Sequence, residues 1–253
     1  MILVFLIFDE FLISFLYKIY FMNIAIVLSG GIGSRMGLNI PKQYVLVNNR
    51  PVISFCLQTF LEDKYTDAIV IVVADEWKKF VQDEVGVLKP QKIVMYAKPG
   101  ETRQYSIFNA LNVVKDSHYN DEDIVLIHDA ARPLVSHALI ARCYNGCSKV
   151  DGVMPVVPVK DTTYLSKDGK HICSLLDRSQ LFCGQSPEAF RFGKYFEIHR
   201  EMSREELLKI NGSTEIAFKA GLDCQMIEGE PINFKITTPE DLASFESIVN
   251  ITK

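Results

Sequence analysis

A glycine-rich segment directly after a short apolar run constrains this chain more than any other feature. Residues 24–27 read Ile-Ala-Ile-Val, a pattern typical of a buried strand. The segment 28–37 follows as Leu-Ser-Gly-Gly-Ile-Gly-Ser-Arg-Met-Gly, and Pro-Lys-Gln stands at 41–43. Glycines let backbone N–H groups approach anionic oxygens closely, and Arg35 and Lys42 add positive charge. The pattern predicts a phosphate-binding loop after the first strand.

Two commoner glycine motifs do not fit this spacing. A dinucleotide-binding fingerprint would need a small residue where Met36 stands, and a Walker A loop would need Gly-Lys-Ser/Thr after the glycines. A plain glycine turn between a strand and a helix is the structural alternative. The arginine and lysine at these offsets favour phosphate binding.

Strand and helix patterns alternate along the rest of the chain. The predicted strands are 24–28, 68–73, 92–96 and 124–127, and the predicted helices are 51–60, 75–85, 102–114 and 136–148. Repeated strand–helix units favour a doubly wound, mostly parallel α/β sheet, within a single domain over 23–253. Residues 153–159 contain Pro155 and Pro158, which favours an edge or crossing strand over a central one.

The segment from about 160 to 183 interrupts this alternation. Residues 162–165 and 171–176 flank Asp168-Gly169, a sequence typical of a hairpin turn. A lone hairpin cannot bury both of its faces, so we expect it to pack against a second subunit.

Residues 1–22 are apolar but include Asp9, Glu10 and Lys18. They lack the basic start and small-residue cleavage site of a signal peptide. A membrane span would place both carboxylates near its middle, at about 2.5–3.5 kcal/mol each. We expect translation to start at Met22, with a membrane-associated helix as the alternative.

Charge and cysteine usage narrow the class of protein. The net charge of −4 argues against broad nucleic-acid binding, which needs a basic surface. The six cysteines form no C-x-x-C pair and no zinc-type array. A reducing cytoplasm is the compartment that fits this pattern.

Polar groups follow two further predicted strands. Residues 100–106 lead into a helix whose first N–H groups suit an anion. Asp129 follows the strand 124–127 and is a natural Mg²⁺ ligand beside nucleotide phosphates, although a carboxylate here also fits a helix N-cap or a loop. We interpret the adjacent His128 as structural.

Eight motifs occur in order along the chain. They are GGIGSRMG at 30–37, PKQY at 41–44, GETR at 100–103, HDAARP at 128–133, PVKDT at 158–162, LDRS at 176–179, GQSP at 184–187 and NFKITTPEDL at 233–242. From about Asn23 to the C-terminus the chain thereby resembles the cytidylyltransferases that act on 2-C-methyl-D-erythritol 4-phosphate and, in a sister branch, on ribitol 5-phosphate.

The resemblance implies a Rossmann-like nucleotidyltransferase sheet with an inserted hairpin arm for dimerisation. It implies transfer of CMP from CTP to a polyol phosphate, giving a CDP-alditol and pyrophosphate. The implied site residues are Arg35, Lys42 and Lys235 at the reacting phosphates; Ser29, Gly30, Gly31, Gly33, Gly100, Arg103 and Ser106 around the nucleotide; Asp129 on Mg²⁺ or another divalent cation; and Thr162 and Arg178 on the acceptor phosphate. Because the arm serves dimerisation, Arg178 would act in the neighbouring subunit of a homodimer.

The motifs indicate more than one possible acceptor. Residues 211–215, Asn-Gly-Ser-Thr-Glu, replace the Thr-Asp-Asp/Glu-Ala-Ser segment usual in erythritol-type enzymes. The motif at 184–187 leans toward the ribitol branch, whereas those at 128–133 and 176–179 lean toward the erythritol branch. We expect 2-C-methyl-D-erythritol 4-phosphate, with ribitol 5-phosphate or another polyol phosphate as the alternative. An NAD-type oxidoreductase and a non-catalytic nucleotide-binding protein are the alternatives from other classes.

Overall fold

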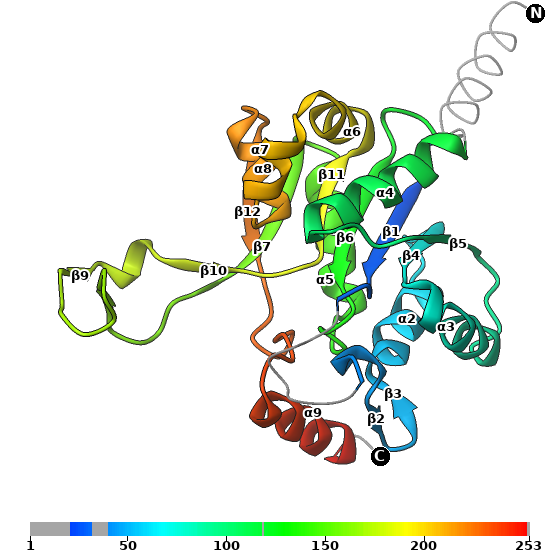
Figure 1. Cartoon of the computed structure of the whole chain (residues 1–253), viewed down its shortest axis with the longest axis horizontal. Coiled ribbons are helices and arrows are strands. Elements are labelled where there is room, and N and C mark those ends of the chain that lie inside the picture. The colour runs from blue at the N-terminus through cyan, green and yellow to red at the C-terminus, as the bar shows by residue number, and fades with distance from the viewer. Residues whose placement is uncertain (1–20, 32–39, 118, 252–253) are drawn as a thin grey trace, which may run out of the picture.

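One eight-stranded sheet forms the centre of the molecule (Figure 1). The computed structural model describes residues 21–31, 40–117 and 119–251. The strands of the sheet are β1 (Asn23–Leu28), β4 (Ala68–Val72), β5 (Ile93–Ala97), β6 (Ile124–Asp129), β7 (Gly152–Pro158), β10 (Phe182–Gly184), β11 (Glu188–Arg191) and β12 (Cys224–Glu228). Their spatial order is β5, β4, β1, β6, β11, β7 and β12, with β10 extending the line of β11 along β7.

The parallel half of the sheet agrees with the predicted strands. β1 pairs in parallel with β4 on one side and with β6 on the other, so Leu28 lies between Val72 and Asp129 in the register. The chain first proceeds from β1 outward to β5 and then returns to form β6 on the opposite side. This reversal leaves a crevice at the carboxyl ends of β1 and β6, the usual place for a ligand in an open α/β sheet.

The prediction that residues 153–159 form an edge or crossing strand is wrong. β7 has β12 on one side and β11 with β10 on the other. Pro155, which has no N–H to donate, lies opposite the break between β10 and β11, where its carbonyl accepts from the Gln185 N–H at 2.8 Å. A central strand tolerates this proline because the ladder needs no donor at that point.

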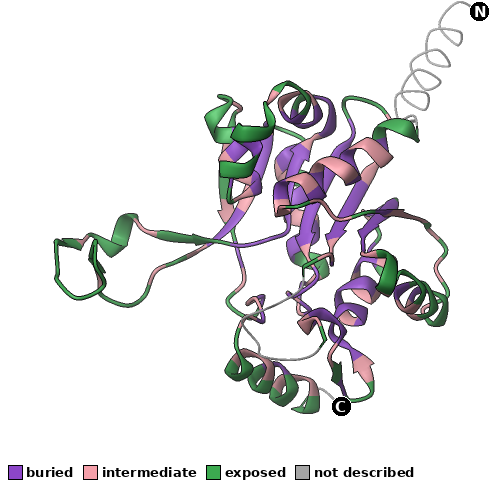
Figure 2. Ribbon diagram, in the orientation of Figure 1, coloured by how far each residue is buried: buried purple, intermediate pink, exposed green. Residues whose placement is uncertain are grey.

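Helices cover both faces of the sheet, which makes it doubly wound (Figure 2). On one face lie α2 (Val52–Glu62), α3 (Asp75–Val87) and α5 (His137–Cys147); on the other lie α4 (Arg103–Asp116), α6 (Phe192–Glu201), α7 (Arg204–Lys209) and α8 (Ser213–Lys219). Ala25 and Val27 of β1 belong to the first core, and Ile24 and Ile26 to the second. This alternation is expected of a strand that is buried on both faces.

A smaller apolar cluster attaches the C-terminal helix α9 (Pro239–Ile251) near the carboxyl ends of the strands. Phe245 of α9 and Ile236 are fully buried in it with Val47 and Val52. Val47 belongs to a short ribbon of β2 (Leu46–Val47) and β3 (Arg50–Pro51), which follows the 3-10 turn η2 (Lys42–Tyr44). The cluster thereby fixes the segments on either side of the crevice.

The predicted hairpin is confirmed and extends away from the sheet (Figure 1). β8 (Thr163–Leu165) pairs antiparallel with β9 (Ser174–Leu176), and a 3-10 turn, η3 (Arg178–Gln180), follows. Gly169 has a φ of 71°, as the predicted turn requires, and the Asp168 carboxylate accepts two backbone N–H groups of the loop. We call residues 160–181 the arm.

Within residues 21–31, 40–117 and 119–251, no helix is long and apolar enough to cross a membrane. Of the apolar segment 1–22, residues 1–20 lie outside the described residues, so the predicted start at Met22 stays a prediction.

Candidate active site

Two loops meet over the carboxyl ends of β1 and β5, and glycines permit the approach. A Cβ on Gly30 would lie 2.4 Å from Cβ of Pro99, and a Cβ on Gly100 would lie 2.3 Å from Cβ of Tyr105. Any side chain at either position would separate the loops or distort the start of α4. These glycines therefore allow the two loops to pack closely and to form one wall of the crevice.

The crevice is a cavity of about 470 Å³. It is lined by Leu28, Gly30, Gly31, Lys42, Gln43, Gly100, Glu101, Thr102, Arg103, Ser106, Asp129, Ala131 and Lys235. Three cationic side chains in this set come from distant parts of the sequence, and two carboxylates, Glu101 and Asp129, lie among them; Glu101 pairs with Arg204 at 2.8 Å. A site with this charge suits a polyanion accompanied by a metal ion.

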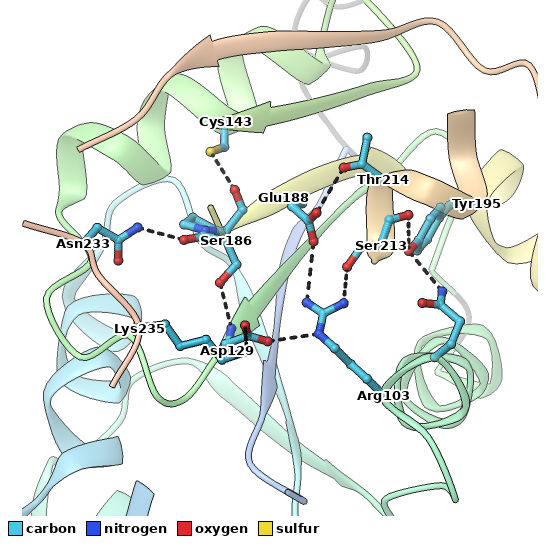
Figure 3. Close-up of polar contacts among 12 residues, drawn as sticks. Arg103, Asp129, Cys143, Ser186, Glu188, Tyr195, Ser213, Thr214, Asn233 and Lys235 are labelled. Carbon is cyan, nitrogen blue, oxygen red and sulfur yellow. Dashed lines mark hydrogen bonds and ion pairs between the residues drawn. The ribbon is translucent and has the colours of Figure 1, made fainter. Parts of the chain in front are cut away.

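Asp129, the last residue of β6, makes two ion pairs in the cavity (Figure 3). Its Oδ1 lies 3.1 Å from Nε of Arg103, and its Oδ2 lies 2.8 Å from Nζ of Lys235. Burial alone would raise the pKa of Asp129, but the charges of Arg103 and Lys235 outweigh burial and hold the pKa well below its usual range. Asp129 is thus an ionised carboxylate; the N-cap of α5 is Ser136, so the N-cap alternative is wrong.

Arg103 begins α4 and contacts three other elements through its guanidinium. Besides the Asp129 contact, Nη1 lies 2.6 Å from Oγ of Ser213, and Nη2 lies 3.6 Å from Oε2 of Glu188. Burial would lower the pKa of Arg103, but Asp129 and Glu188 raise it above its ordinary value. The guanidinium is therefore a fixed positive charge at the edge of the cavity.

Lys235 reaches Asp129 from the loop between β12 and α9, which buried amides hold in place. The Gln185 side chain donates to the backbone oxygen of Glu230 at 2.9 Å and accepts from its N–H at 3.0 Å. Asn233, fully buried, donates through Nδ2 to the backbone oxygen of Ser186 at 2.8 Å. These bonds fix the loop two residues before Lys235.

His128 belongs to the core, in agreement with its interpretation as structural. It is fully buried, its Nε2 lies 3.0 Å from the backbone oxygen of Arg132, and its ring packs edge-on against Phe60. Burial lowers its pKa to about 4, so the ring is neutral at pH 7. Its Nε2 donates to a carbonyl, and the ring does not line the cavity.

Of the remaining residues expected around the nucleotide, some line the cavity and others do not. Gly31 and Ser106 line the cavity, and the Ser106 hydroxyl bonds to the N–H of Gly100 at 3.0 Å. Ser29 does not line it: its buried hydroxyl donates to the carbonyl of Val72 at 2.6 Å, within the sheet. Arg35 and Gly33 fall in residues 32–39, outside the described residues.

Thr162 and Arg178 lie apart from the cavity of their own chain. Both are exposed on the arm, and Nη1 of Arg178 donates to the backbone oxygen of Lys160 at 2.8 Å. One chain therefore does not bring these two residues to Asp129.

A second cavity of about 380 Å³ adjoins the first, since Lys235 lines both. Its lining includes two further cations, Arg132 and Lys160, beside Cys183 and Phe234. Arg132 and Lys160 stand within two of the eight motifs, but the sequence predicted no role for them. Arg132 follows β6 and Lys160 begins the arm, and these positions could have indicated a place beside the site.

Comparison with known proteins agrees with this geometry. The family model described as "IspD: 2-C-methyl-D-erythritol 4-phosphate cytidylyltransferase" matches residues 23–251. A Clostridium beijerinckii protein named for the same activity is 36% identical over 225 residues, which cover 89% of this chain and 97% of that protein. A ribitol-5-phosphate cytidylyltransferase of Vibrio parahaemolyticus is 30% identical, over 90% of this chain and 96% of that protein.

Solved structures give the same result for the fold. The crystal structure of the Francisella tularensis 2-C-methyl-D-erythritol 4-phosphate cytidylyltransferase superposes with a TM-score of 0.73 at 26% identity, over 89% of this chain and 99% of that one. An Anaerococcus prevotii structure, of a 4-diphosphocytidyl-2C-methyl-D-erythritol synthase, gives a TM-score of 0.76 at 23% identity, over 91% and 96%. The expected Rossmann-like sheet is confirmed.

Proposed function

The chain belongs to the 2-C-methyl-D-erythritol 4-phosphate cytidylyltransferase family, and from this we propose that it transfers CMP from CTP to that alditol phosphate. The products are a CDP-alditol and pyrophosphate. Three relatives named for this activity are 33–36% identical to the chain, which supports this acceptor over ribitol 5-phosphate. Family membership does not support the oxidoreductase alternative.

One observation carries the proposal: three cations and the ionised carboxylate of Asp129 gather at the switch point of the sheet. Lys42, Arg103, Asp129 and Lys235 line a single cavity although up to 193 residues separate them in sequence (235 − 42). The two glycine loops beside them present backbone groups at close range. We assign the nucleotide to this cavity and the acceptor phosphate to the adjoining one, which Arg132 and Lys160 line.

The chemistry needs charge compensation more than proton transfer. An oxygen of the acceptor phosphate bonds to the α-phosphorus of CTP, the bond from that phosphorus to the bridging oxygen breaks, and pyrophosphate leaves. The attacking oxygen is already anionic at pH 7, so no base is required. The two anions repel each other, and even two unit charges about 4 Å apart interact by about 4 kcal/mol at an effective dielectric of about 20. Lys42 and Lys235 would offset this repulsion and stabilise the departing charge.

The residues present fit a magnesium ion at Asp129. No cluster of three or more metal-ligating side chains exists among the described residues, so Asp129 would supply a carboxylate ligand, and phosphate oxygens and water would supply most of the others. Its low pKa keeps it ionised as such a ligand must be. When bound, Mg²⁺ would neutralise triphosphate charge. Lys235, which pairs with Oδ2 of Asp129, would turn toward the phosphates, while Arg103 stays on Oδ1.

We also propose a homodimer in which the arm serves the partner's site. Its large apolar side chains are exposed in the single chain: Tyr164 by 54%, Leu165 by 48%, Ile172 by 68% and Leu175 by 65%. Such residues gain about 25 cal/mol for each Å² that a partner covers. Thr162 and Arg178, which do not reach their own cavity, would bind the acceptor phosphate next to the partner's Asp129.

We propose that the protein works in the cytoplasm. All six cysteines are free thiols, and the residues that remain exposed, Cys173 and Cys183, would stay reduced there.

The proposal is tested by pyrophosphate release from CTP and Mg²⁺ with each candidate acceptor. We expect turnover with 2-C-methyl-D-erythritol 4-phosphate at a kcat/KM at least tenfold above that with ribitol 5-phosphate. A preference for ribitol 5-phosphate would overturn the acceptor, and absence of pyrophosphate release with any polyol phosphate would overturn the activity. The Lys79→Gln variant, which changes an exposed lysine that does not line the cavity, is the matched control for lysine variants in the site.

A further inference from the structure

The guanidinium of Arg103 is held from three directions, and only one of them is the reacting site (Figure 3). Asp129 of β6 takes Nε, Ser213 of α8 takes Nη1, and Glu188 of β11 faces Nη2. Resting on the proposed function, we propose that Glu188, Ser213 and Thr214 are positioning residues that hold Arg103 in the orientation needed for transfer of CMP. They act through Arg103 and do not themselves line the nucleotide cavity.

Thr214 fixes the carboxylate of Glu188. Its Oγ1 donates to Oε1 of Glu188 at 3.0 Å, which leaves Oε2 directed at Arg103. Glu188 is only 8% exposed. A buried carboxylate with a hydroxyl on one oxygen and a guanidinium near the other has a single favourable orientation, because either bond lost would leave it unsatisfied.

Ser213 is itself fixed by a second set of contacts. It is fully buried, and its backbone oxygen accepts from the hydroxyl of Tyr195 at 3.1 Å. The ring of Tyr195 stacks on Phe190 of β11 at a centroid distance of 4.1 Å. The start of α8 is therefore tied to the same strand that carries Glu188.

The division of Arg103 between two carboxylates matters for the reaction. Without Glu188 and Ser213, the guanidinium would have Asp129 as its remaining anionic partner in the site and would be free to rotate about its long side chain. With them, Nε stays on Asp129 while the outer nitrogens are turned toward β11 and α8. Glu188 and Ser213, which do not line the cavity, thus set the orientation of the Arg103 guanidinium at its edge.

The positioning of Arg103 gives a function to the segment that departs from the erythritol-type pattern. Residues 211–215 replace the usual Thr-Asp-Asp/Glu-Ala-Ser, and Ser213 and Thr214 of this segment supply both hydroxyls of the arrangement.

The test compares Thr214→Val, which removes the hydroxyl at nearly constant volume, with Thr214→Ser, which keeps it. We expect Thr214→Val to lower kcat about tenfold with little change in the KM for CTP, since loss of a hydrogen bond to a charged group is worth about this much. Thr214→Ser is expected to restore kcat to within about twofold of wild type. Thr59→Val, which removes a helix-surface hydroxyl bonded only to its own helix, is the control for the substitution.

A double-mutant cycle separates positioning from a general structural effect. Arg103→Lys keeps the charge beside Glu188 but lacks the planar fork, so Thr214→Val should then lower kcat by less than about twofold. An equal loss in both backgrounds would overturn the inference, as would wild-type kcat for Thr214→Val. If the wild-type protein itself releases no pyrophosphate from CTP, the proposed function fails instead, and the two failures are distinct.

Discussion

Replacement of Lys235 by glutamine removes one positive charge from the point where the two cavities meet. Nζ of Lys235 lies 2.8 Å from Oδ2 of Asp129, and the lysine side chain is 36% exposed. A unit charge about 4 Å from a phosphate oxygen contributes about 4 kcal/mol at a dielectric of about 20, and partial exposure reduces this to about 2–3 kcal/mol. At about 1.4 kcal/mol per factor of ten, Lys235→Gln should lower kcat by about 30- to 150-fold.

The assay is steady-state pyrophosphate release at saturating CTP and acceptor, with thermal unfolding measured in parallel. Arg103 still pairs with Asp129 in the variant, so the melting temperature should change by no more than a few degrees. Lys79→Gln removes a lysine that pairs with Asp83 at 2.7 Å but is 82% exposed, and it should leave kcat unchanged. A Lys235→Gln enzyme within a few-fold of wild type would refute the electrostatic reasoning.

Three further outcomes follow from the structure. Gln185→Leu, which removes both bonds to the backbone of Glu230, should lower kcat about tenfold by loosening the loop that carries Lys235; unchanged kinetics would show that the loop is held without it. Mixing Arg178→Ala with Lys235→Gln subunits should restore about a quarter of wild-type activity, because half of the dimers then hold one intact composite site; no restoration would place Arg178 in its own subunit's site or show that subunits do not share sites. Burial lowers the pKa of His199 to about 4, so the unfolded chain binds the extra proton first as pH falls below about 6.5, and unfolding free energy should fall by up to about 3 kcal/mol between pH 6.5 and 4. Urea titrations should show a shallower decline over this window for His199→Gln, and an identical decline would contradict the assignment.

The parallel half of the fold was predictable because its strands are buried on both faces and stand out as apolar runs. β4 reads Ala-Ile-Val-Ile-Val and is entirely buried. β7 was misplaced for a reason that lies outside its own sequence. Pro155 is tolerated because the neighbouring strand is interrupted opposite it, and only the paired structure reveals that interruption.

The charged centre of the site was predictable from motifs, whereas its support was not. Lys42, Arg103, Asp129 and Lys235 each stand in a motif of the family and each lines the cavity. Glu188 and Ser213 carry no local pattern that indicates a function, since a buried carboxylate and a buried hydroxyl acquire their role only from the guanidinium between them.

Ser29 shows where a motif-based assignment and the local contacts diverge. The family resemblance assigns Ser29 to the nucleotide, whereas its hydroxyl donates to the carbonyl of Val72 inside the sheet. A polar side chain at the end of a buried strand must first satisfy the backbone around it.

A crystal structure with Mg²⁺ and a non-hydrolysable CTP analogue would show whether fixed cations, without a general base, bring the two phosphates together. We expect Nζ of Lys42 and of Lys235 to lie within hydrogen-bond distance of triphosphate oxygens, with no histidine near the α-phosphorus. Both lysines directed away from the triphosphate, or a histidine positioned to accept a proton there, would contradict this mechanism.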